Sequence, residues 1–371
     1  MKTNLKRFLV FALIIALVPL LVGCGIFKKK PKQPDVPPTV IEYGDLSIHF
    51  LELGNRYAGD CIYIKYGEMD ILIDAGSRQG SAATICGYLN NHVTDKLDFV
   101  IATHAHQDHI AGFYGNSGGP NGRTGVLYNF EIDTIIDYSR TNSTAAIKTN
   151  YETQARAYAI AHGATHYTAA QCFDETDGAQ KIYEIGEGIE MEILYNYYYF
   201  NNSSDENDYS VCVMIRQGEN QYLFTGDLEA SGENHLVNYY EPSGGLGHCV
   251  LYKAGHHGSV TSSSSKLLEE ITPEYVVVCC VAGDDEYTGN FDTQFPTKAF
   301  LTRIAVYTDA VYVTSVRLYG ETPNFGSMNG DIVFNVFSDG KITVVGSNNS
   351  TKLKDTDWFE KRGWGAWPIG E

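Results

Sequence analysis

The chain has 371 residues, with 27 Lys and Arg against 45 Asp and Glu, which gives a formal net charge of −18. Bulk electrostatics therefore oppose non-specific binding to nucleic acid, which normally needs a basic face. Of the eight cysteines, Cys24 lies near the N-terminus and seven lie further along. An odd number without regular spacing does not indicate a disulfide framework, so we expect buried thiols with at most one or two bridges.

The N-terminal segment is typical of a secreted protein. Three basic residues in the first seven positions precede an apolar run at 8–22, and this run is shorter than a transmembrane helix usually needs, which predicts a secretory signal. The run ends in Leu21-Val22-Gly23-Cys24, which resembles a bacterial lipoprotein signal; an ordinary signal or an uncleaved anchor are the alternatives. We expect a lipoprotein signal peptide at 1–23, lipidation of Cys24, and anchoring on the extracytoplasmic face of the cell membrane.

A tether is expected at 24–44, where three lysines precede four prolines. Proline-rich chain is semi-extended and would lift the following domain off the membrane, and the lysines could also touch anionic headgroups. The remaining residues, about 325, suit one large α/β domain. We place this domain at 45–348 and a C-terminal tail at 349–371.

Strand-like and helical segments alternate along the domain in two successive halves. In the first half we expect strands at 46–53, 61–66, 70–74, 97–102 and 132–136, with helices near 80–91 and 144–163. In the second half we expect strands at 190–199, 210–216, 221–226, 249–253 and 275–281, with helices near 229–240, 264–270 and 296–305. Strands at 310–318, 331–337 and 341–345 would complete the fold.

The segment His104-Ala105-His106-Gln107-Asp108-His109 directly follows the apolar strand at 97–102. A lone His-x-His pattern is usually a surface feature or chance. Here, however, four potential ligands stand within six positions. Neutral imidazole and carboxylate are the groups that zinc and related ions bind in hydrolytic centres. The segment therefore indicates a metal site at the end of a strand.

Three other predicted strands end in the same kind of residue. Asp74 ends the first of them, Asp227 follows the strand at 221–226, and His256 with His257 follows the strand at 249–253. Any one of these ends could be an ordinary turn. Four together indicate that the polar residues share one rim of a sheet.

These motifs, in this order, resemble those of the metallo-β-lactamase superfamily and, more narrowly, the extracellular hydrolase domain of ComEC-type competence proteins. The resemblance extends from about residue 46 to residue 346, and its motifs are specific for the superfamily but much less so for the substrate. The matching segments are 50–54, 59–64, 73–76, 103–109, 207–210, 224–229 and 253–259, followed by the serines at 262–265.

The resemblance implies an α/β fold of the αββα sandwich type, with two divalent metal ions at the rim of the sheets. Zn²⁺ is the first expectation and Mn²⁺ the alternative. Asp74 would orient the His-x-His loop without binding metal. The implied ligands are His104 and His106 for one metal, Asp108, His109 and either His256 or His257 for the other, and Asp227 as the bridge.

The sequence departs from the family pattern at two places. Many superfamily members supply a third His to the first metal, whereas His162 and His166 here lie in a predicted helix end and turn. The segment that aligns holds Asn207 and Asp208, so one of these, or water, would fill that corner. The second departure is 294–296, Gln-Phe-Pro, where the ComEC-like pattern usually has Gly-His-Pro.

Two such metals would hold a hydroxide and polarise a carbonyl or phosphoryl oxygen, which allows hydrolysis without a covalent enzyme intermediate. Asp108 and Asp227 would take part in catalysis as metal ligands, and Asp108 or a bound water would protonate the leaving group. Lys253 and Ser259, beside the imidazole pair, could hold a phosphate oxygen. Lys253 could equally be a strand residue that faces solvent.

We therefore expect a membrane-anchored, metal-dependent hydrolase of phosphoesters, of the nuclease or phosphodiesterase kind. The acidic charge disfavours nucleic acid as a partner, so a small phosphodiester such as a phosphorylcholine ester, or a lactone or amide, is the enzymatic alternative. A surface binding protein with a degraded metal site is the non-enzymatic alternative, supported by the missing third His.

Overall fold

The computed structural model describes residues 42–370 of the chain. The expected signal peptide at 1–23, the lipidated Cys24 and nearly all of the tether at 24–44 lie outside the described residues. Within residues 42–370, every helix is too short or too polar to cross a lipid bilayer.

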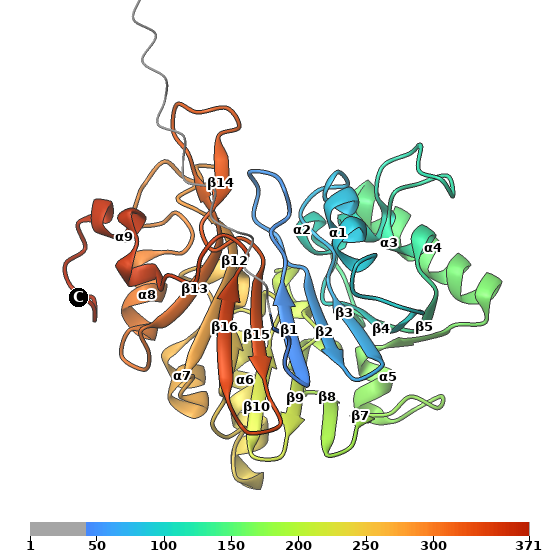
Figure 1. Ribbon diagram of the computed structural model, residues 1–371. Helices are drawn as coiled ribbons and strands as arrows, with labels where there is room; N and C mark the ends of the chain where they lie inside the picture. Colours follow the sequence, from blue (N-terminus) through green and yellow to red (C-terminus); the bar gives the residue numbers. More distant parts are fainter. Residues whose placement is uncertain (1–41, 371) are drawn as a thin grey trace, which may run out of the picture. The chain divides into compact units, whose positions relative to one another are not determined.

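Two eight-stranded sheets pack face to face at the centre of the described domain (Figure 1). The first sheet has the order β16 (Ile342–Gly346), β15 (Ile332–Val336), β1 (Leu46–Phe50), β2 (Ile62–Tyr66), β3 (Met69–Ile73), β4 (Leu97–Ala102), β5 (Ile132–Asp137) and β6 (Thr165–Thr168). The second has the order β14 (Phe325–Ser327), β13 (Ala310–Arg317), β12 (Tyr275–Ala282), β11 (Leu251–Lys253), β10 (Asn220–Phe224), β9 (Val213–Gln217), β8 (Ile189–Ile193) and β7 (Ile182–Gly186).

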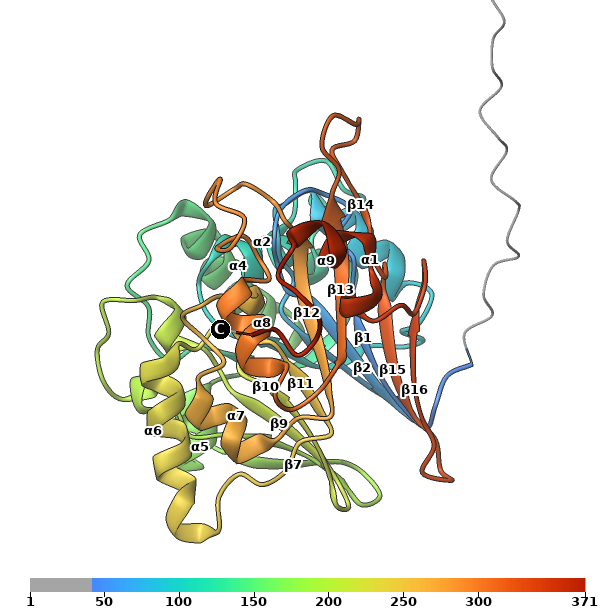
Figure 2. The same ribbon diagram turned by 90° about the vertical axis from the view of Figure 1, so that its left-hand side faces the viewer.

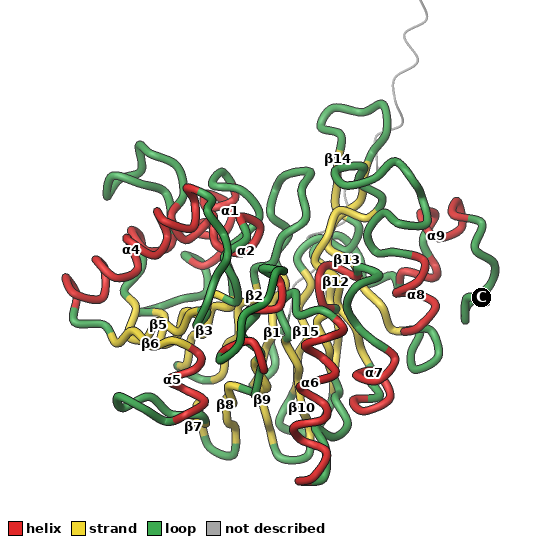
Figure 3. The backbone as a smooth tube through the Cα atoms, turned by 180° about the vertical axis from the view of Figure 1, so that it is seen from behind, coloured by secondary structure: helices red, strands yellow, loops and turns green. Residues whose placement is uncertain are grey.

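Helices cover the outer side of each sheet, so that the strands lie between two helical layers (Figure 3). The predicted αββα sandwich is thereby confirmed. The helices of the first half are α1 (Ser81–Leu89), α2 (Gln107–Tyr114), α3 (Val126–Asn129), α4 (Ala146–His162) and α5 (Ala169–Asp174). Those of the second half are α6 (Ala230–Tyr240), α7 (Ser265–Ile271), α8 (Lys298–Ile304) and α9 (Asp357–Arg362).

Apolar side chains between the sheets hold the two halves together. The ring of Phe50 in β1 lies 6.4 Å from that of Phe224 in β10, and the ring of Tyr222 lies 5.9 Å from that of Phe334 in β15. These four residues are almost fully buried, and burial of a large side chain contributes roughly 1.5–3 kcal/mol. The alternation of such residues along each strand directs one face of the strand toward this shared core.

Most predicted elements match the observed ones within a few residues. The strand predicted at 190–199 is shorter, because β8 ends at Ile193 and Tyr197–Tyr199 form a 3-10 turn. The segment around His166 forms β6 instead of a turn, and the His166 ring pairs with Asp137 at 2.8 Å. The seven cysteines in the described residues are free and buried, in agreement with the prediction of buried thiols.

The predicted C-terminal tail packs against the second sheet. Figure 2 shows α9 beside α8 and β13. Leu353, Phe359 and Ile369 are buried in the core that lies between this sheet and its helices. Residues 349–370 thus contribute to the same hydrophobic core as α6, α7 and α8.

Candidate metal centre

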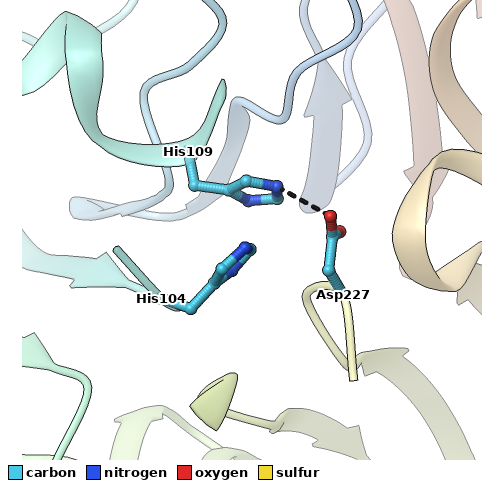
Figure 4. A group of neighbouring side chains, drawn as sticks. All are labelled: His104, His109 and Asp227. Atoms are coloured by element: carbon cyan, nitrogen blue, oxygen red, sulfur yellow. Dashed lines mark ion pairs between the residues drawn. The ribbon is translucent and has the colours of Figure 1, made fainter. Parts of the chain in front are cut away.

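The candidate site forms where parallel strands of both sheets end. β3 and β4 are parallel neighbours in the first sheet, and β10 and β11 are parallel neighbours in the second. Carboxyl ends of parallel strands meet at one edge of a sheet, which is where α/β proteins place their sites. The residues that follow these strands include Asp74, His104, Asp227 and His257, and their side chains converge at this edge (Figure 4 shows His104, His109 and Asp227).

Backbone hydrogen bonds tie the loops of the site together. The Ala75 N–H donates to the His109 carbonyl at 2.7 Å, and the Gly112 N–H donates to the Ala75 carbonyl at 2.5 Å. Gly76 packs so closely on this segment that a Cβ atom there would lie 1.4 Å from the carbonyl oxygen of Asp108. Only glycine can be placed so close to the Asp108 backbone. This explains the glycine at the end of the Ile73-Asp74-Ala75-Gly76 motif.

Two imidazoles are oriented by hydrogen bonds at their Nδ1 atoms. His109 donates from Nδ1 to Asp74 at 2.7 Å, and its Nε2 lies 3.1 Å from an oxygen of Asp227. His257 donates from Nδ1 to the carbonyl of Cys279 at 2.9 Å, and its Nε2 lies 3.4 Å from Asp227. A partner at one ring nitrogen fixes the tautomer and leaves the other nitrogen available to a metal.

Asp74 has the orienting position that the resemblance implies. It is fully buried, and its oxygens accept from the Thr103 backbone N–H at 2.8 Å and from the Thr103 hydroxyl at 2.7 Å. The φ angle of Asp74 is 60°, in the left-handed region. A non-glycine residue there is strained by about 1–3 kcal/mol, and such strain is typically found at functional sites.

The ligand atoms form adjacent groups that share residues. Within each group the atoms lie within 4.8 Å of one another, and the first group is His104, His109 and Asp227. The further groups are Asp108 with His109 and His257, Asp60 with Asp227 and His257, and Asp60 with Asp74 and His109. His106 lies beside the first group, because its Nδ1 is 3.0 Å from Nε2 of His104. Two adjacent cations would fit this arrangement better than one.

Buried polar atoms without hydrogen-bond partners test whether a metal fits. Among the described residues, Nε2 of His109, Nε2 of His257 and Oδ1 of Asp227 are buried and lack such a partner. A buried polar group left in this state costs about 1–3 kcal/mol or more. Divalent cations would satisfy these atoms, so the residues fit the metals that the family resemblance implies.

The charges of the cluster are strongly coupled. Although burial opposes ionisation, His109, His257 and Lys253 hold the pKa of Asp227 well below its usual range. Burial lowers the pKa of His257, but the charges of Asp227 and Asp60 raise it to about 10. The carboxylates thus attract positive charge to the site, whether that charge is a proton or a metal ion.

An open cleft of about 540 Å³ leads to the cluster. His256 lines this cleft and lies outside the ligand groups, because its Nδ1 faces Thr261 at 3.0 Å and Glu229 at 3.4 Å. Of the adjacent His pair, the structure therefore brings His257 into the cluster and turns His256 outward. The other lining residues are Arg78, His106, Gln107, Asp108, Asp227, Ser259, Tyr287 and Phe295.

Comparison with known proteins supports the motif-based resemblance. No family model matches the sequence. The chain is 27% identical over 219 residues to competence protein ComA of Neisseria gonorrhoeae, which is 59% of this chain and 25% of that protein. It is 30% identical over 112 residues to recombination protein 2 of Haemophilus influenzae, which is 30% of this chain and 12% of that protein. The matched part thus spans a quarter or less of these relatives.

These matches are to competence-type proteins, and the αββα sandwich of the chain is the fold that the motif-based resemblance implies. Among solved structures, it is similar to the metallo-β-lactamase fold protein YhfI from Bacillus subtilis, with 12% identity and a TM-score of 0.43. That similarity covers 73% of this chain and 95% of the other chain. The clustered imidazoles and carboxylates at the rim of the two sheets form a candidate metal centre.

The segment predicted to replace the third His lies close to the site of this ComEC-like protein. Asn207 and Asp208 are each 6% exposed, and Oδ1 of each is buried without a hydrogen-bond partner among the described residues. Asp208 accepts from Ser203 at 2.6 Å and is outside the ligand groups described above. Ser210 comes closer, since its hydroxyl lies 3.4 Å from Nδ1 of His104. A ligand role for Asn207 or Asp208 stays a prediction.

Lys253 does not face solvent, so that alternative was wrong. Its side chain is 0% exposed, its ammonium contacts the carboxylate of Asp60, and it donates to the Gly226 carbonyl at 3.1 Å. Oδ1 of Asp227 lies 3.5 Å away. Contact of Lys253 with a substrate stays a prediction, while its observed contacts are those of an ammonium that holds two carboxylates. Ser259, 5% exposed, lines the cleft where an anion could reach it.

Asp60 is the residue of this site that the sequence motifs did not single out. It is fully buried, and its carboxylate faces Lys253, Nδ1 of His257 at 3.3 Å and Nδ1 of His109 at 3.8 Å. Asp60 precedes β2 instead of following a strand, so the strand-end pattern that located the other ligands did not reach it. Its position inside a matched segment, 59–64, was the available signal.

Proposed function

We propose that this ComEC-like chain is a metal-dependent hydrolase of phosphodiesters that uses two divalent ions, Zn²⁺ first. The observation that carries the proposal is the set of inward-facing, unpartnered ligand atoms of His109, His257 and Asp227 beside an open cleft. Bound divalent ions would polarise a phosphoryl oxygen and lower the pKa of an attacking water.

The cleft supplies groups suited to an anionic substrate. Arg78 lines it, with the guanidinium carbon 4.0 Å from the ring centre of Tyr57 and one nitrogen 2.5 Å from Glu286. A guanidinium held on an aromatic ring and a carboxylate is pre-positioned, which lowers the entropy lost when it binds a phosphate oxygen. The Ser259 hydroxyl offers a second contact. This lining favours a phosphodiester over a neutral lactone or amide.

The location of the protein is part of the proposal. The basic residues, apolar run and Cys24 at the N-terminus support a lipid-anchored protein on the extracytoplasmic face of the membrane. Metabolic labelling with a radioactive fatty acid tests this. The wild-type chain should be labelled and a Cys24→Ala chain should not. Equal labelling of both would exclude lipidation at Cys24.

Hydrolysis assays test the proposed chemistry. The full chain would be incubated with Zn²⁺ or Mn²⁺ and either bis(p-nitrophenyl) phosphate or single- and double-stranded DNA. We expect hydrolysis that is lost in Asp108→Ala and Asp227→Ala chains and retained in Asp174→Ala, a matched change of an exposed carboxylate at the end of α5. Absence of metal-dependent hydrolysis of every phosphodiester would reject the proposal. Cleavage of the small diester alone would assign a small natural substrate.

A further inference from the structure

A cavity of about 730 Å³ lies beside β1 and β2, at the end of β3 that is remote from the metal centre. Gly67, which precedes β3, lines this β1–β2 cavity, whereas Asp74 of the metal centre follows β3. The strand between them extends over about 16 Å. The β1–β2 cavity shares no lining residue with the metal cleft, and its volume is within the range of sites that bind small organic molecules.

Buried, hydrogen-bonded groups line the deepest part of the β1–β2 cavity. His49 is 1% exposed, and its Nε2 lies 2.8 Å from the Ser47 hydroxyl, while its Nδ1 lies 2.6 Å from the Tyr88 hydroxyl. Burial, assisted by the charge of His92, holds the pKa of His49 well below its usual range. The imidazole is therefore neutral at physiological pH. A neutral surface of this kind favours an uncharged ligand, because a bound ion would lose hydration without gaining a partner charge.

The two charged side chains that line the β1–β2 cavity have opposite signs. They are the carboxylate of Asp45 and the ammonium of Lys65. Lys65 is already paired with Asp70 at 2.8 Å, and Asp70 also accepts from the Tyr63 hydroxyl. Asp45 is exposed, so water and salt screen its charge. The lining thus selects neither an anion nor a cation.

Aromatic rings on one side of the β1–β2 cavity are held in fixed positions. Tyr43 is 47% exposed and stacks on the His49 ring, with 5.4 Å between the ring centres. Its hydroxyl donates to Nε2 of His92 at 3.1 Å, and Nδ1 of His92 donates to the Tyr88 carbonyl at 2.9 Å. The half-buried ring of Tyr66 lines the same cavity. Fixed rings offer flat apolar surfaces at a low cost in conformational entropy.

Side-chain amides add both donors and acceptors to the β1–β2 cavity. The amide nitrogen of Asn91 donates to the Gly87 carbonyl at 2.9 Å, which leaves its carbonyl oxygen as an acceptor for a ligand. The carbonyl oxygen of Gln217 accepts from the Tyr222 hydroxyl at 3.1 Å, which leaves its amide nitrogen as a donor. A ligand hydroxyl both donates and accepts, so it can pair with either kind of group.

We propose that the β1–β2 cavity binds a neutral saccharide. A pyranose ring carries hydroxyls around its edge and C–H groups on its faces, so it needs uncharged polar groups and flat aromatic surfaces together. The cavity combines the two without a net charge among its lining residues. Binding there would attach the domain to a glycan at one end of β3 and leave the metal cleft at the other end open. The inference goes beyond the proposed hydrolysis and does not depend on it.

Calorimetric titration of the metal-free full chain with cellotriose, maltotriose and triacetylchitotriose tests the inference. We expect at least one of these neutral trisaccharides to bind at a single site with an affinity that does not change with salt concentration. Tyr43→Ala should weaken this binding about tenfold, and Gln217→Ala about fivefold. Tyr43→Phe keeps the ring and should weaken binding less than Tyr43→Ala does.

Tyr239→Ala is the matched control, because Tyr239 is 45% exposed on α6 and lines neither the β1–β2 cavity nor the metal cleft. It should bind as the wild type does. The inference is wrong if none of the three trisaccharides binds at millimolar concentration, or if the Tyr43→Ala and Gln217→Ala chains bind as tightly as the wild type. Preferential, salt-dependent binding of glucose 6-phosphate or glucosamine would also overturn it. Hydrolysis of bis(p-nitrophenyl) phosphate by the wild-type chain decides the hydrolase proposal independently.

Discussion

Replacement of Asp60 by Asn should destabilise the fold even without metal. The carboxylate of Asp60 and the ammonium of Lys253 are both 0% exposed and in direct contact. With a neutral amide at position 60, the buried Lys253 ammonium keeps the Gly226 carbonyl at 3.1 Å and the Asp227 carboxylate at 3.5 Å as partners. Breaking a buried ion pair by removing one partner costs about 3–5 kcal/mol. Because Asp227 remains, we expect a loss of about 3 kcal/mol in the free energy of unfolding.

Urea unfolding of the chelator-treated chain measures this loss. The matched control is Asp133→Asn, which breaks the exposed ion pair with Lys96 and should cost far less, because water screens an exposed pair. The double change Asp60→Asn with Lys253→Met should cost less than the sum of the two single changes, because the pair is removed as a unit. If Asp60→Asn costs no more than the control, or if the two single costs simply add, the reasoning is wrong.

Three further predictions concern pH, loop packing and metal. Burial, together with the charge of Glu52, raises the pKa of Asp331 to about 6 from 3.8, so the free energy of unfolding falls as pH rises from about 4 to 6. In urea unfolding, Asp331→Asn should therefore increase the free energy of unfolding by up to about 3 kcal/mol at pH 8 and by little at pH 4. An equal increase at both pH values would contradict this. Gly76→Ala should weaken Zn²⁺ binding more than tenfold in calorimetry, because the added Cβ would displace the backbone at Asp108. Gly87→Ala is the control and should leave Zn²⁺ binding unchanged, because a Cβ there meets nothing within 4 Å. Zn²⁺ should raise the melting temperature of the chelator-treated chain but not of Asp227→Ala; an equal rise in both would place the metal elsewhere.

Much of the architecture is readable from periodicity. The eight-residue β12 is a continuous apolar run, typical of a central parallel strand, and it was predicted within one residue. β7 and β14 were missed because they are short, partly exposed edge strands with little pattern. α9 was missed because Phe359 is buried only through contacts with the distant hydrophobic core of the second sheet.

The sequence predicted the site residues that directly follow strands. It did not predict those whose positions depend on how distant parts of the chain pack together. His256 and His257 are neighbours of the same type, and only their backbone, with φ of 45° and 54°, settles which ring faces the cluster. Asp60 and Ser210 reach the site from loops whose paths depend on the packing of both sheets. Glu206 supports the His-x-His loop, because its carboxylate accepts from the Ala105 N–H at 3.2 Å and from the Asn142 N–H at 2.7 Å. The two segments are far apart in the sequence, so no local pattern reveals this contact.

The order of strands in the first sheet has a consequence for how this protein is made. β1, the first strand, is flanked by β2 and by β15, and β16 follows β15 at the edge. During synthesis, β1 appears long before β15, so one side of β1 has no neighbouring strand while the rest of the chain is still emerging. An open apolar strand edge readily pairs with another polypeptide. Interruption of synthesis before β15 would therefore give an aggregating fragment instead of a smaller folded domain.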